Sequence, residues 1–386
     1  MMARPEGEEV VRLEGRRLIE PARRLLARLR PVGAERDRAG NRKLFFDQYV
    51  ALLLLYFFTP TLTSLRSLQN ASNWEQTRRK LGVGRASLGA LSEAAGVFDA
   101  KYLRAVVQEL ACQALPLAQG REAQALEGLT AVDGTFFAAL PRMAWALWED
   151  VRHRGVKLHL QFDVLKSVPC DALLTPAASS EPRQLKRMLQ PRRLYVLDRG
   201  YASYELFAAI LDAGSSLVAR VKNNVAFVVQ QERPLDEAAR AAGVVRDLEI
   251  SRLGTAHHKN HLAERPLRLV VVQIQTRTGP SELWLVTDRI DLSADLVALA
   301  YRHRWSVELF FRWLKCVLGT RHLVSHRANG VTLQMYAALI VSLLVTLHTQ
   351  RKPTKRTFET IQFYLAGWVS DEEFDAHLAS LQRLDA

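Results

Sequence analysis

Two short apolar segments of this chain each lead into an aspartate. The first is LTAVDGTFFAAL (129–140), where Asp133 ends the apolar run, and the second is RRLYVLDRGY (192–201), where Asp198 does. Between them, GVKLHLQFDVL alternates apolar and polar residues as a half-buried strand does, and DALLTPA has the pattern of another short strand. The pattern predicts a β-sheet with an aspartate at the end of two of its strands.

Helical patterns separate the later strands. EPRQLKRMLQ and YELFAAILDAG are helical on either side of the second aspartate segment, and SSLVARVK is a further strand. Three strands, helix, strand, helix, strand is the order of a ribonuclease-H-like α/β core. From about 223 to 290 the segments shorten and alternate, which predicts a mainly β insertion, and helices resume near Ser293. The predicted fold class is therefore α/β, with this core, the insertion and a helical N-terminal region.

The overall charge is strongly positive. With 53 Lys and Arg against 40 Asp and Glu, the net charge is +13 and the sequence pI about 9.9, which favours a polyanionic partner, nucleic acid first. An acidic membrane surface would need an amphipathic or lipid anchor, and we find neither. The two most apolar stretches, 49–58 and 335–348, fall short of the roughly 18 residues of a membrane span, so we expect buried core helices and no membrane. Three cysteines without metal or redox spacing indicate a reducing compartment, and the charged N-terminal segment lacks the apolar core of a signal peptide.

Helices joined by tight turns are predicted between residues 44 and 117. Their N-caps and ends are expected at Thr63, Ser87, Gly82 and Gly96. The basic residues in this region are Arg66, Arg78, Arg79, Lys80 and Arg85. The pattern suits a helix-turn-helix DNA reader, and it also suits a small helical bundle packed on the main domain. The Arg- and Leu-rich segment 1–43 is either a basic helix on DNA or a solvated helix with an apolar stripe.

A third carboxylate, Glu308, lies in the basic and aromatic segment AYRHRWSVELFFRWLK (300–315). Two aspartates at strand ends and one helical glutamate are what a two-metal phosphoryl-transfer site requires, because Mg²⁺ prefers oxygen ligands and paired ions assist both the attacking and the leaving oxygen. Without a cation, three such carboxylates repel one another. The alternative is an ion-paired surface helix, in which Arg304 neutralises Glu308 at a spacing of i, i+4.

Helix geometry favours a functional face. At about 100° per residue, four polar residues of this segment project within an arc of roughly 60°: Tyr301, Arg304, Glu308 and Lys315. One face could then hold a metal ion and bind phosphates beside it. Taken alone, the segment does not decide between this face and the surface ion pair.

Other polar residues near the expected sheet have competing interpretations. Asp163 and Asp171 are rivals for the first carboxylate, and Asp133 is preferred because it directly follows the first core strand. Arg199 and Tyr201, beside Asp198, contact DNA or brace the turn between strand and helix. The histidines of HHKNH (257–261) could hold zinc, but no fourth ligand of matching spacing is visible, and a polar loop tip is the alternative.

The spacing Y-x2-R-x3-E-x6-K resembles the signature of the insertion sequence four family of DDE transposases. DGT at 133 and DRGY at 198 are similar to that family's first and second acidic motifs, and ELWLVTDR and SHRANGVTLQMYAALIVSLLV flank the signature in matching places. LLLLYFFTPTLTSLRSLQ and LGVGRASLGALSEAAGVF resemble its amino-terminal region. The resemblance covers most of residues 44 to 350, and it rests on three motifs in the family's order.

The resemblance implies cut-and-paste DNA transposition. The catalytic metal ligands would be Asp133, Asp198 and Glu308, holding two Mg²⁺ ions for which Mn²⁺ can substitute. Backbone phosphates near the cleaved end would be bound by Tyr301, Arg304 and Lys315. Trp284 would stack on a flipped base, in a family whose members often excise through a hairpin intermediate. The implied partners are double-stranded DNA, as terminal inverted repeats and as target, and a second copy of the chain when DNA ends are bound. The implied location is the bacterial cytoplasm, associated with the nucleoid.

On this basis we expect a helical DNA-binding region at 1–120, a ribonuclease-H-like catalytic core at 121–222 and 291–350, a β-rich insertion at 223–290 and a C-terminal helical tail at 351–386. Two rival functions remain. The first is a two-metal nuclease that cuts DNA without joining it, since fold alone does not fix function. The second is a catalytically silent DNA-binding regulator derived from a transposase, whose DNA binding would survive loss of Asp133.

Overall fold

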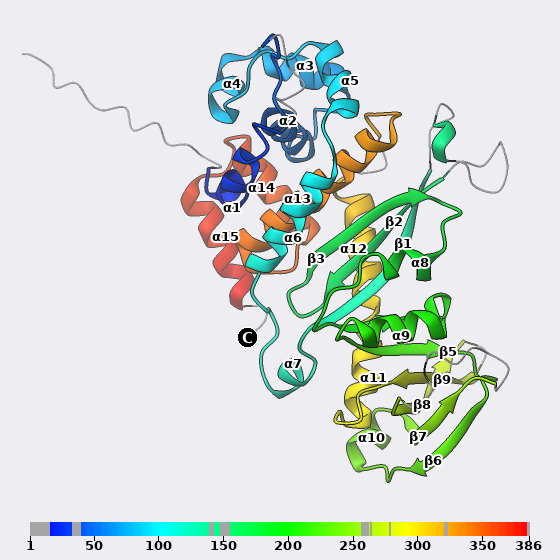
Figure 1. The fold of residues 1–386 in the computed structure, drawn as a ribbon. Coiled ribbons are helices and arrows are strands. Elements are labelled where there is room, and N and C mark those ends of the chain that lie inside the picture. Colours follow the sequence, from blue (N-terminus) through cyan, green and yellow to red (C-terminus); the bar gives the residue numbers. More distant parts are fainter. Residues whose placement is uncertain are drawn as a thin grey trace, which may run out of the picture.

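The strands of the computed structural model form one mixed sheet (Figure 1). The structure describes residues 16–32, 40–138, 143–146, 155–255, 262, 265–277, 279–319 and 323–383. In chain order the strands are β1 (Leu129–Ala138), β2 (Gly155–Asp163), β3 (Val168–Pro176), β4 (Leu194–Leu197), β5 (Ser216–Val221), β6 (Phe227–Glu232), β7 (Val244–Leu253), β8 (Leu267–Thr276) and β9 (Gly279–Thr287). Among these described residues the sheet has nine strands in the order β3-β2-β1-β4-β5-β9-β8-β7-β6.

The first five strands follow the order expected from the sequence. β1, β2 and β3 are antiparallel neighbours, and β1 then pairs in parallel with β4, as β4 does with β5. The two helices between these later strands, α8 (Glu181–Lys186) and α9 (Tyr204–Asp212), also lie where the sequence indicated. The protein is thus a mixed α/β structure with a parallel centre.

The segment between residues 223 and 290 is mainly β, as expected, and it extends the same sheet. β6 to β9 are antiparallel neighbours, and β9 pairs with β5 from Val218–Thr287 to Val221–Trp284. One short helix, α10 (Glu237–Ala241), lies between β6 and β7. Because the last inserted strand is hydrogen-bonded to β5, the end of the insertion lies beside the central strands.

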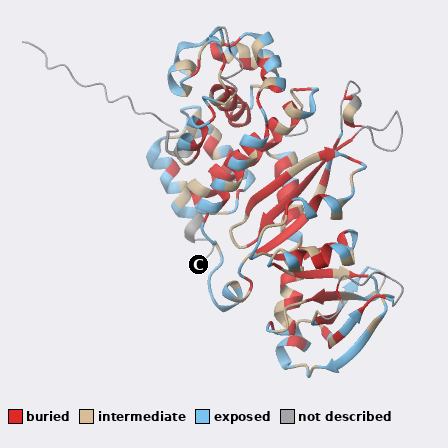
Figure 2. Cartoon of the chain, viewed as in Figure 1, coloured by how far each residue is buried: buried red, intermediate tan, exposed pale blue. Residues whose placement is uncertain are grey.

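Helices cover both faces of the central strands. α8 and α9 lie on one face, and α11 (Ala294–Arg302), α12 (Trp305–Cys316) and α13 (Ala328–Thr349) lie on the other (Figure 1). The apolar side chains form two clusters, one between the sheet and α9, and a larger one that joins the opposite face to α12, α13 and the N-terminal helices. This double cover buries the central strands, as Figure 2 shows.

β2 is buried along its whole length, whereas its alternating sequence predicted a half-buried strand. The polar residues of the alternation face α8 and are paired there. Lys157 forms an ion pair with Glu181, His159 Nε2 lies 2.9 Å from the hydroxyl of Thr175, and Gln161 Nε2 donates to the carbonyl of Met188 over 2.8 Å. The prediction was wrong because period-two polarity indicates two different faces, and here the polar face is covered by partners.

The N-terminal region is helical, with α1 (Arg16–Ala27), α2 (Phe46–Phe58), α3 (Leu65–Asn73), α4 (Glu75–Leu81), α5 (Leu88–Val97), α6 (Lys101–Gln113) and the short α7 (Arg121–Ala125). α1, α2, α5 and α6 pack against α13, and α6 also packs on β3. At the C-terminal end, α14 (Lys355–Leu365) packs on α2 and on α15 (Asp371–Arg383). Ser87 caps α5 and Gly82 ends α4 with a positive φ, as predicted, but Ser64 rather than Thr63 caps α3, and Gly96 lies inside α5.

α13 is the longest helix in the described part of the chain and the most deeply buried. It contains the apolar stretch 335–348 and has 22 residues, so by length and composition it could cross a membrane. The apolar stretch is therefore part of a helix that is longer than the run of apolar residues indicated. Within that helix 89% of the most apolar window is buried inside the protein, in agreement with the expected core helix. The other stretch, 49–58, belongs to α2, which is also largely buried.

Candidate active site

Asp133 and Asp198 occupy matching positions on neighbouring parallel strands. The last paired residues of β1 and β4 are Ala131 and Val196, and each aspartate lies two residues beyond its strand's member of that pair. Parallel strands lie about 4.8 Å apart, so the two carboxylates start from adjacent points on the backbone. The sequence suggested that Asp133 follows the end of its strand, but Asp133 lies inside β1, which continues to Ala138 through its pairing with β2. Only the parallel pairing ends there.

Local hydrogen bonds hold both carboxylates. Asp198 caps the 3-10 turn η3 (Arg199–Tyr201), where its Oδ1 accepts from the backbone N–H of Gly200 over 2.8 Å. Oδ1 of Asp133 accepts from the N–H of Gly134 over 2.7 Å. Both side chains are half-buried at the edge of the parallel strands. The glycine that follows or nearly follows each aspartate therefore takes part in orienting it.

Glu308 lies in the first turn of α12, and this helix is separate from α11, which carries Tyr301. The single helix over 300–315 that we expected is wrong. At the junction, the N–H groups of Arg304, Ser306 and Val307 bond to carbonyls three residues back rather than four. Such i, i+3 bonds tighten the turn and break the 3.6-residue period. The arc of roughly 60° therefore holds for Glu308 and Lys315 on α12, and it does not extend to Tyr301 on α11.

Arg304 links the helix to the sheet. Its Nη2 lies 2.6 Å from Oε1 of Glu308, and its Nη1 lies 4.0 Å from Oδ2 of Asp133. The Arg304–Glu308 ion pair considered from the sequence is therefore present, and the same guanidinium also faces the first aspartate. α12 packs directly on β1, which explains how Glu308 reaches the edge where β1 and β4 stop pairing.

Negative charge accumulates at this edge. Burial raises the pKa of Asp133 to about 6, and the charges of Asp198 and Glu181 contribute, against the opposing effects of Gly134 and Arg304. Burial likewise raises the pKa of Tyr201 well above its usual value, with contributions from Glu181, Asp133 and Asp198. The carboxylates thus share one electrostatic environment, and the positive charge of Arg304 only partly offsets their negative charge.

Tyr301 and Arg220 lie together beside the point where β1 and β4 stop pairing and where Asp133 and Asp198 lie; we call this place the acidic edge. Arg220 lies in register with Asp198, since Arg220 and Asp198 are each one residue beyond the last β4–β5 pair, Leu197 with Ala219. It therefore occupies on β5 the position that Asp133 and Asp198 occupy on β1 and β4. Burial raises the pKa of Tyr301, against the charges of Arg304 and Arg220 and a hydrogen bond with Arg220. The buried Nε of Arg220 has no hydrogen-bond partner among the described residues. Sequence reasoning missed Arg220, although its place at the end of SSLVARVK was a usable signal.

Lys315, in the last turn of α12, lies with its Nζ 5.2 Å from the ring centre of Phe137 on β1. Phe137 is on the same face of β1 as Asp133, four residues further along the strand. Lys315 therefore faces the same strand as Glu308 and lies further from the carboxylates along it. The structure places Asp133, Asp198 and Arg304 at one end of the parallel strands, with Tyr301 beside them, whereas Glu308 approaches the aspartates only through Arg304 and Lys315 lies at the margin.

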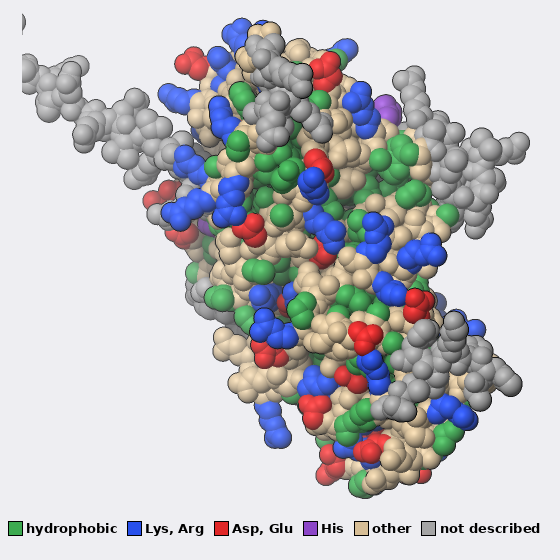
Figure 3. Space-filling view, in the orientation of Figure 1, with side chains coloured by type: hydrophobic (Ala, Val, Ile, Leu, Met, Phe, Trp, Pro, Cys, Tyr) green, Lys and Arg blue, Asp and Glu red, His purple; other side chains and the backbone are tan. Residues whose placement is uncertain are grey.

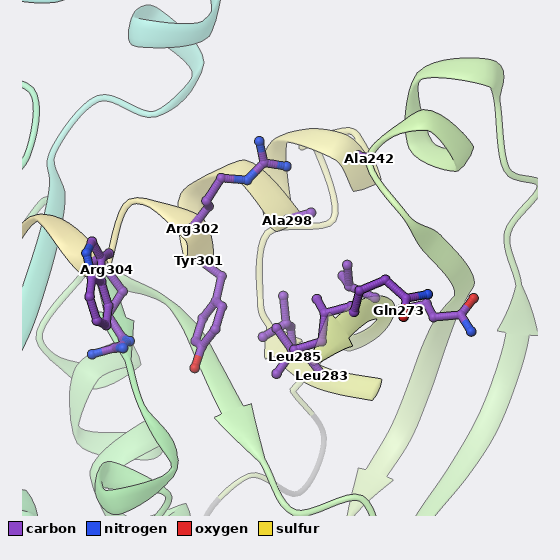
Figure 4. Close-up of a pocket in the computed structure, with 12 residues that line it drawn as sticks. Ala242, Gln273, Leu283, Leu285, Ala298, Tyr301, Arg302 and Arg304 are labelled. Carbon is purple, nitrogen blue, oxygen red and sulfur yellow. The ribbon is translucent and has the colours of Figure 1, made fainter. Parts of the chain in front are cut away.

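Trp284 lies on the opposite face of the sheet. It pairs with Val221 on β9 and β5, packs edge-on to Phe227 at 5.7 Å, and belongs to the cluster between the sheet and α9. Its indole N–H donates to Oε2 of Glu282 over 2.9 Å. Its neighbours Leu283 and Leu285 point the other way, into a pocket of about 380 Å³ between β9 and α11. Figure 4 shows Tyr301 and Arg304 beside these leucines in that pocket.

The rival aspartates have structural partners elsewhere. Asp163 Oδ2 lies 2.9 Å from Nη1 of Arg193, and Asp171 accepts two hydrogen bonds of 2.7 Å from Arg104 on α6. Neither faces Asp198. The histidines 257, 258 and 261 lie outside the described residues. Within the described residues, no group of three or more His, Cys, Asp or Glu side chains converges closely enough to enclose a metal ion as placed.

Glu181 and Lys157 are further charged residues at this edge that sequence reasoning missed. Glu181 is the first residue of α8, and its Oε1 forms an ion pair with Nζ of Lys157 on β2. Lys157 was visible as a polar residue in an alternating strand, but nothing in EPRQLK distinguishes Glu181 from an ordinary acid in the first turn of a helix. An edge of this composition can hold hard cations on its carboxylates and phosphate on Arg304, Arg220 and Tyr301.

Comparison with known proteins gives the family. The sequence model of the Transposase DDE domain matches residues 124–344, more than half of the chain. A putative transposase of Sinorhizobium fredii, y4zB, is 29% identical over 229 residues, which are 59% of this chain and 62% of that protein. The probable transposase for insertion sequence element IS5377 of Geobacillus stearothermophilus is 28% identical over 223 residues, 58% of this chain and 56% of that protein.

The matched regions thus span less than two thirds of these relatives' own lengths. A solved structure, the piggyBac transposase synaptic complex with hairpin DNA, aligns with 94% of this chain and 80% of its own at a TM-score of 0.42 and 10% identity. The matched family region contains both strand-end aspartates and Glu308. The chain belongs to the Transposase DDE domain family.

Proposed function

We propose that this protein is a DNA transposase that cleaves the ends of an insertion sequence and transfers them to target DNA. In this proposal the first five strands are a ribonuclease-H-like catalytic core, and the chain is a member of the insertion sequence four group with its Tyr-Arg-Glu-Lys signature. Water attacks the phosphodiester at the element end and its bond to the 3′ oxygen breaks. The freed 3′ hydroxyl then attacks a phosphodiester of the target, whose bond to its own 3′ oxygen breaks, so that the element end is joined to the target and a target 3′ hydroxyl is released.

One observation carries the proposal. Asp133 and Asp198 sit at matching positions where two parallel strands stop pairing, and α12 brings Glu308 to the same edge through Arg304. Open α/β sheets bind ligands at the carboxyl ends of their strands, so the carboxylates lie where substrate can reach them. The matched family range, residues 124–344, includes all three carboxylates and supports the proposal. Together these favour phosphoryl transfer over a purely DNA-binding role.

The proposed cofactor is Mg²⁺, as two ions for which Mn²⁺ can substitute. Asp133, Asp198 and Glu308 are hard oxygen donors, and Mg²⁺ keeps several waters when one or two carboxylates bind it. Burial raises the pKa of Asp133, and the charges of Asp198 and Glu181 add to the rise, so a bound cation would favour the ionised carboxylate. As placed, Glu308 is held by Arg304 and does not converge with the aspartates, so release of Arg304 is part of the proposal. When bound, such ions assist the attacking and leaving oxygens of the phosphate.

The residues proposed to bind the DNA end are Tyr301, Arg304 and Lys315. Arg304 can exchange a carboxylate for a phosphate, since its planar guanidinium fits either in two-pronged fashion. Arg220 adds a second guanidinium with a buried Nε that lacks a partner in the described structure. A set of phosphate-binding side chains of this kind keeps the cut DNA end bound until it is joined. A nuclease that only cuts has less need to retain the cut end.

A flipped base has two proposed positions. Trp284 on the far face of the sheet is the one implied by the family resemblance, and the pocket between β9 and α11 is the second. The pocket lies beside Tyr301 and Arg304, and base stacking on an aromatic ring contributes about 1–3 kcal/mol. Hairpin formation that is lost in Trp284→Ala and kept in Tyr301→Ala would select Trp284. A hairpin kept in Trp284→Ala would select the pocket.

Double-stranded DNA, as terminal repeats and target, is the proposed partner of the N-terminal helices. Between residues 64 and 97 the chain has five basic and two acidic residues, and Trp74 there is 71% exposed. Figure 3 shows Lys and Arg side chains spread over these helices. Synapsis of two ends requires at least a homodimer on DNA. The cell compartment proposed is the bacterial cytoplasm, at the nucleoid.

The test is a cleavage assay on linear DNA that carries the element's own flanking repeat, with Mg²⁺. Glu308→Gln is compared with Glu359→Gln on α14, a matched glutamate that also pairs with a cation four residues earlier. We expect nicks at the repeat boundary by wild type and Glu359→Gln, and none by Glu308→Gln. Equal nicking by both variants would remove Glu308 from the site. Cutting without joining to a second duplex would favour the nuclease, and binding without cutting would favour the regulator.

A further inference from the structure

Glu181 reaches the acidic edge from the face of the sheet opposite α12. It starts α8, which packs on η3 directly after Asp198. One carboxylate oxygen, Oε1, pairs with Lys157, which is buried on β2 and stacks 4.7 Å from the ring centre of Phe136. The other oxygen, Oε2, lies near Gly200, the residue whose backbone N–H donates to Asp198. Glu181 therefore joins the edge without belonging to any of the three motifs.

Two glycines leave the space that this carboxylate uses. A Cβ on Gly134 would lie 2.9 Å from Oε1 of Glu181 and 2.6 Å from Cε of Lys157. A Cβ on Gly200 would lie 3.2 Å from Oε2 of Glu181 and 3.2 Å from Oδ1 of Asp198. Both positions are closer than side chains tolerate without movement of a neighbour. The glycines of DGT and DRGY thus keep Glu181 next to the two aspartates.

A buried hydroxyl points to a ligand at the same place. Tyr201 is 1% exposed, and its hydroxyl has no hydrogen-bond partner among the described residues. The carboxylates whose charges act on this hydroxyl are Glu181, Asp133 and Asp198. Leaving a buried hydroxyl without a partner is destabilising, so its retention beside three carboxylates indicates a polar group that is bound there in the working state.

We propose that Glu181 is a fourth carboxylate of the site, which helps Asp133 and Asp198 bind a hydrated divalent cation, with the Tyr201 hydroxyl contacting the same hydration water. The inference rests on the proposed function. Among the described residues the carboxylates do not enclose a bare ion, so the cation proposed here is one that keeps its water and is held across longer distances. Lys157 holds Glu181 in place and partly neutralises the edge when the cation is absent.

The experiment measures Mn²⁺ binding to the full chain by isothermal titration calorimetry, without DNA. We expect Glu181→Gln to weaken Mn²⁺ about 10- to 100-fold, the usual effect of removing a group that supports metal ligands. Glu205→Gln is the matched control, because Glu205 on α9 pairs with Lys186 in the same way at an exposed position. It should bind Mn²⁺ as wild type does.

Loss of Glu181 leaves Lys157 buried without its partner, so two further variants guard against misfolding. Lys157→Met should bind Mn²⁺ at least as tightly as wild type, since a competing cation is gone. The double variant Lys157→Met/Glu181→Gln removes the ion pair as a unit and should show the same 10- to 100-fold loss as Glu181→Gln. Circular dichroism establishes that each variant is folded.

Wild-type affinity in the double variant would overturn the inference, and so would equal losses in Lys157→Met and Glu181→Gln, which mark a purely structural pair. Either result leaves the proposed function intact if wild type still cuts the repeat boundary. A wild-type protein that neither binds Mn²⁺ nor cuts DNA would overturn the proposed function itself. The two failures are therefore distinguishable.

Discussion

Asp133→Asn should stabilise the protein at neutral pH when no divalent cation is present. Burial raises the pKa of Asp133 from its ordinary value of 3.8 to about 6, so the folded protein holds a proton that the unfolded chain has already released. Stability must therefore fall as pH rises from about 4 to about 6, and the penalty is complete above that. Each pKa unit is about 1.36 kcal/mol, so the rise corresponds to about 3 kcal/mol at pH 8. The side chain is 21% exposed, which makes this an upper bound.

The assay is urea unfolding in EDTA at pH 4, 6 and 8, with Asp291→Asn as a control of opposite sign. We expect Asp133→Asn to gain up to about 3 kcal/mol over wild type at pH 8 and almost nothing at pH 4. A hydrogen bond from Arg289 lowers the pKa of Asp291, so Asp291→Asn should lose stability at pH 8 and pH 6, and this loss should shrink only below the carboxyl's ordinary pKa of 3.8. A difference between Asp133→Asn and wild type that does not change with pH would refute the reasoning.

Three other substitutions test the remaining parts. Arg104→Met leaves the Asp171 carboxylate, which is 1% exposed, without its partner, and should lower the free energy of unfolding in urea by about 3–5 kcal/mol. Arg28 forms an exposed pair with Glu109 of the same helix α6, so Arg28→Met should lower it by under about 1 kcal/mol. Equal losses would contradict the role of burial. Arg304→Lys keeps the positive charge but loses the two-pronged guanidinium. The loss of one charged hydrogen bond, about 1.5–3 kcal/mol, should slow cleavage of end DNA about 10- to 150-fold while DNA binding is retained. An unchanged cleavage rate would count against the proposed role of Arg304. Lys315→Ala should reduce the slope of log affinity against log salt by about 1, measured by fluorescence anisotropy, and an unaltered slope would exclude a phosphate contact.

The sequence was sufficient to locate the sheet and its two aspartates. The strand signals at 129–132 and 194–197 are strong because each segment is short and apolar and is bounded by polar or glycine residues, and the signal at 155–163 is the alternation of apolar and polar residues. The order of these segments with α8 and α9 also predicted that Asp133 and Asp198 come from the same sheet. Their matching register could not be predicted, because it depends on which residues of β1 and β4 hydrogen-bond, and that is set by packing across the whole sheet.

The break between α11 and α12 was not predictable from periodicity. His303 and Arg304 both have helical φ and ψ, and neither is a glycine or proline, so the local sequence carries no stop signal. The change from i, i+4 to i, i+3 hydrogen bonds follows from tertiary packing, since α11 lies on β5, β8 and β9 while α12 lies on β1 and β2. Two helices that pack on different strands of a twisted sheet cannot share one straight axis.

Residues outside the motifs were missed for a related reason. Glu181 and Arg220 follow ordinary patterns, an acid in the first turn of a helix and a cation near the end of a strand, and only the fold shows that both face the acidic edge. The glycines of DGT and DRGY gave the usable hint. Since neither has a positive φ, their conformations do not require glycine, but the space that a Cβ would take is occupied by the side-chain ends of Glu181, Lys157 and Asp198.

Arg304 explains how a basic, aromatic helix start tolerates a carboxylate before any ligand is bound. With no cation present, Glu308 and Asp133 would repel each other, and the guanidinium between them offsets that repulsion at 2.6 Å from one and 4.0 Å from the other. The same geometry makes Arg304 a competitor of the cation for Glu308. A phosphate that draws Arg304 away therefore frees the carboxylate for the ion, so that in the proposed function DNA and metal favour each other's binding through one side chain.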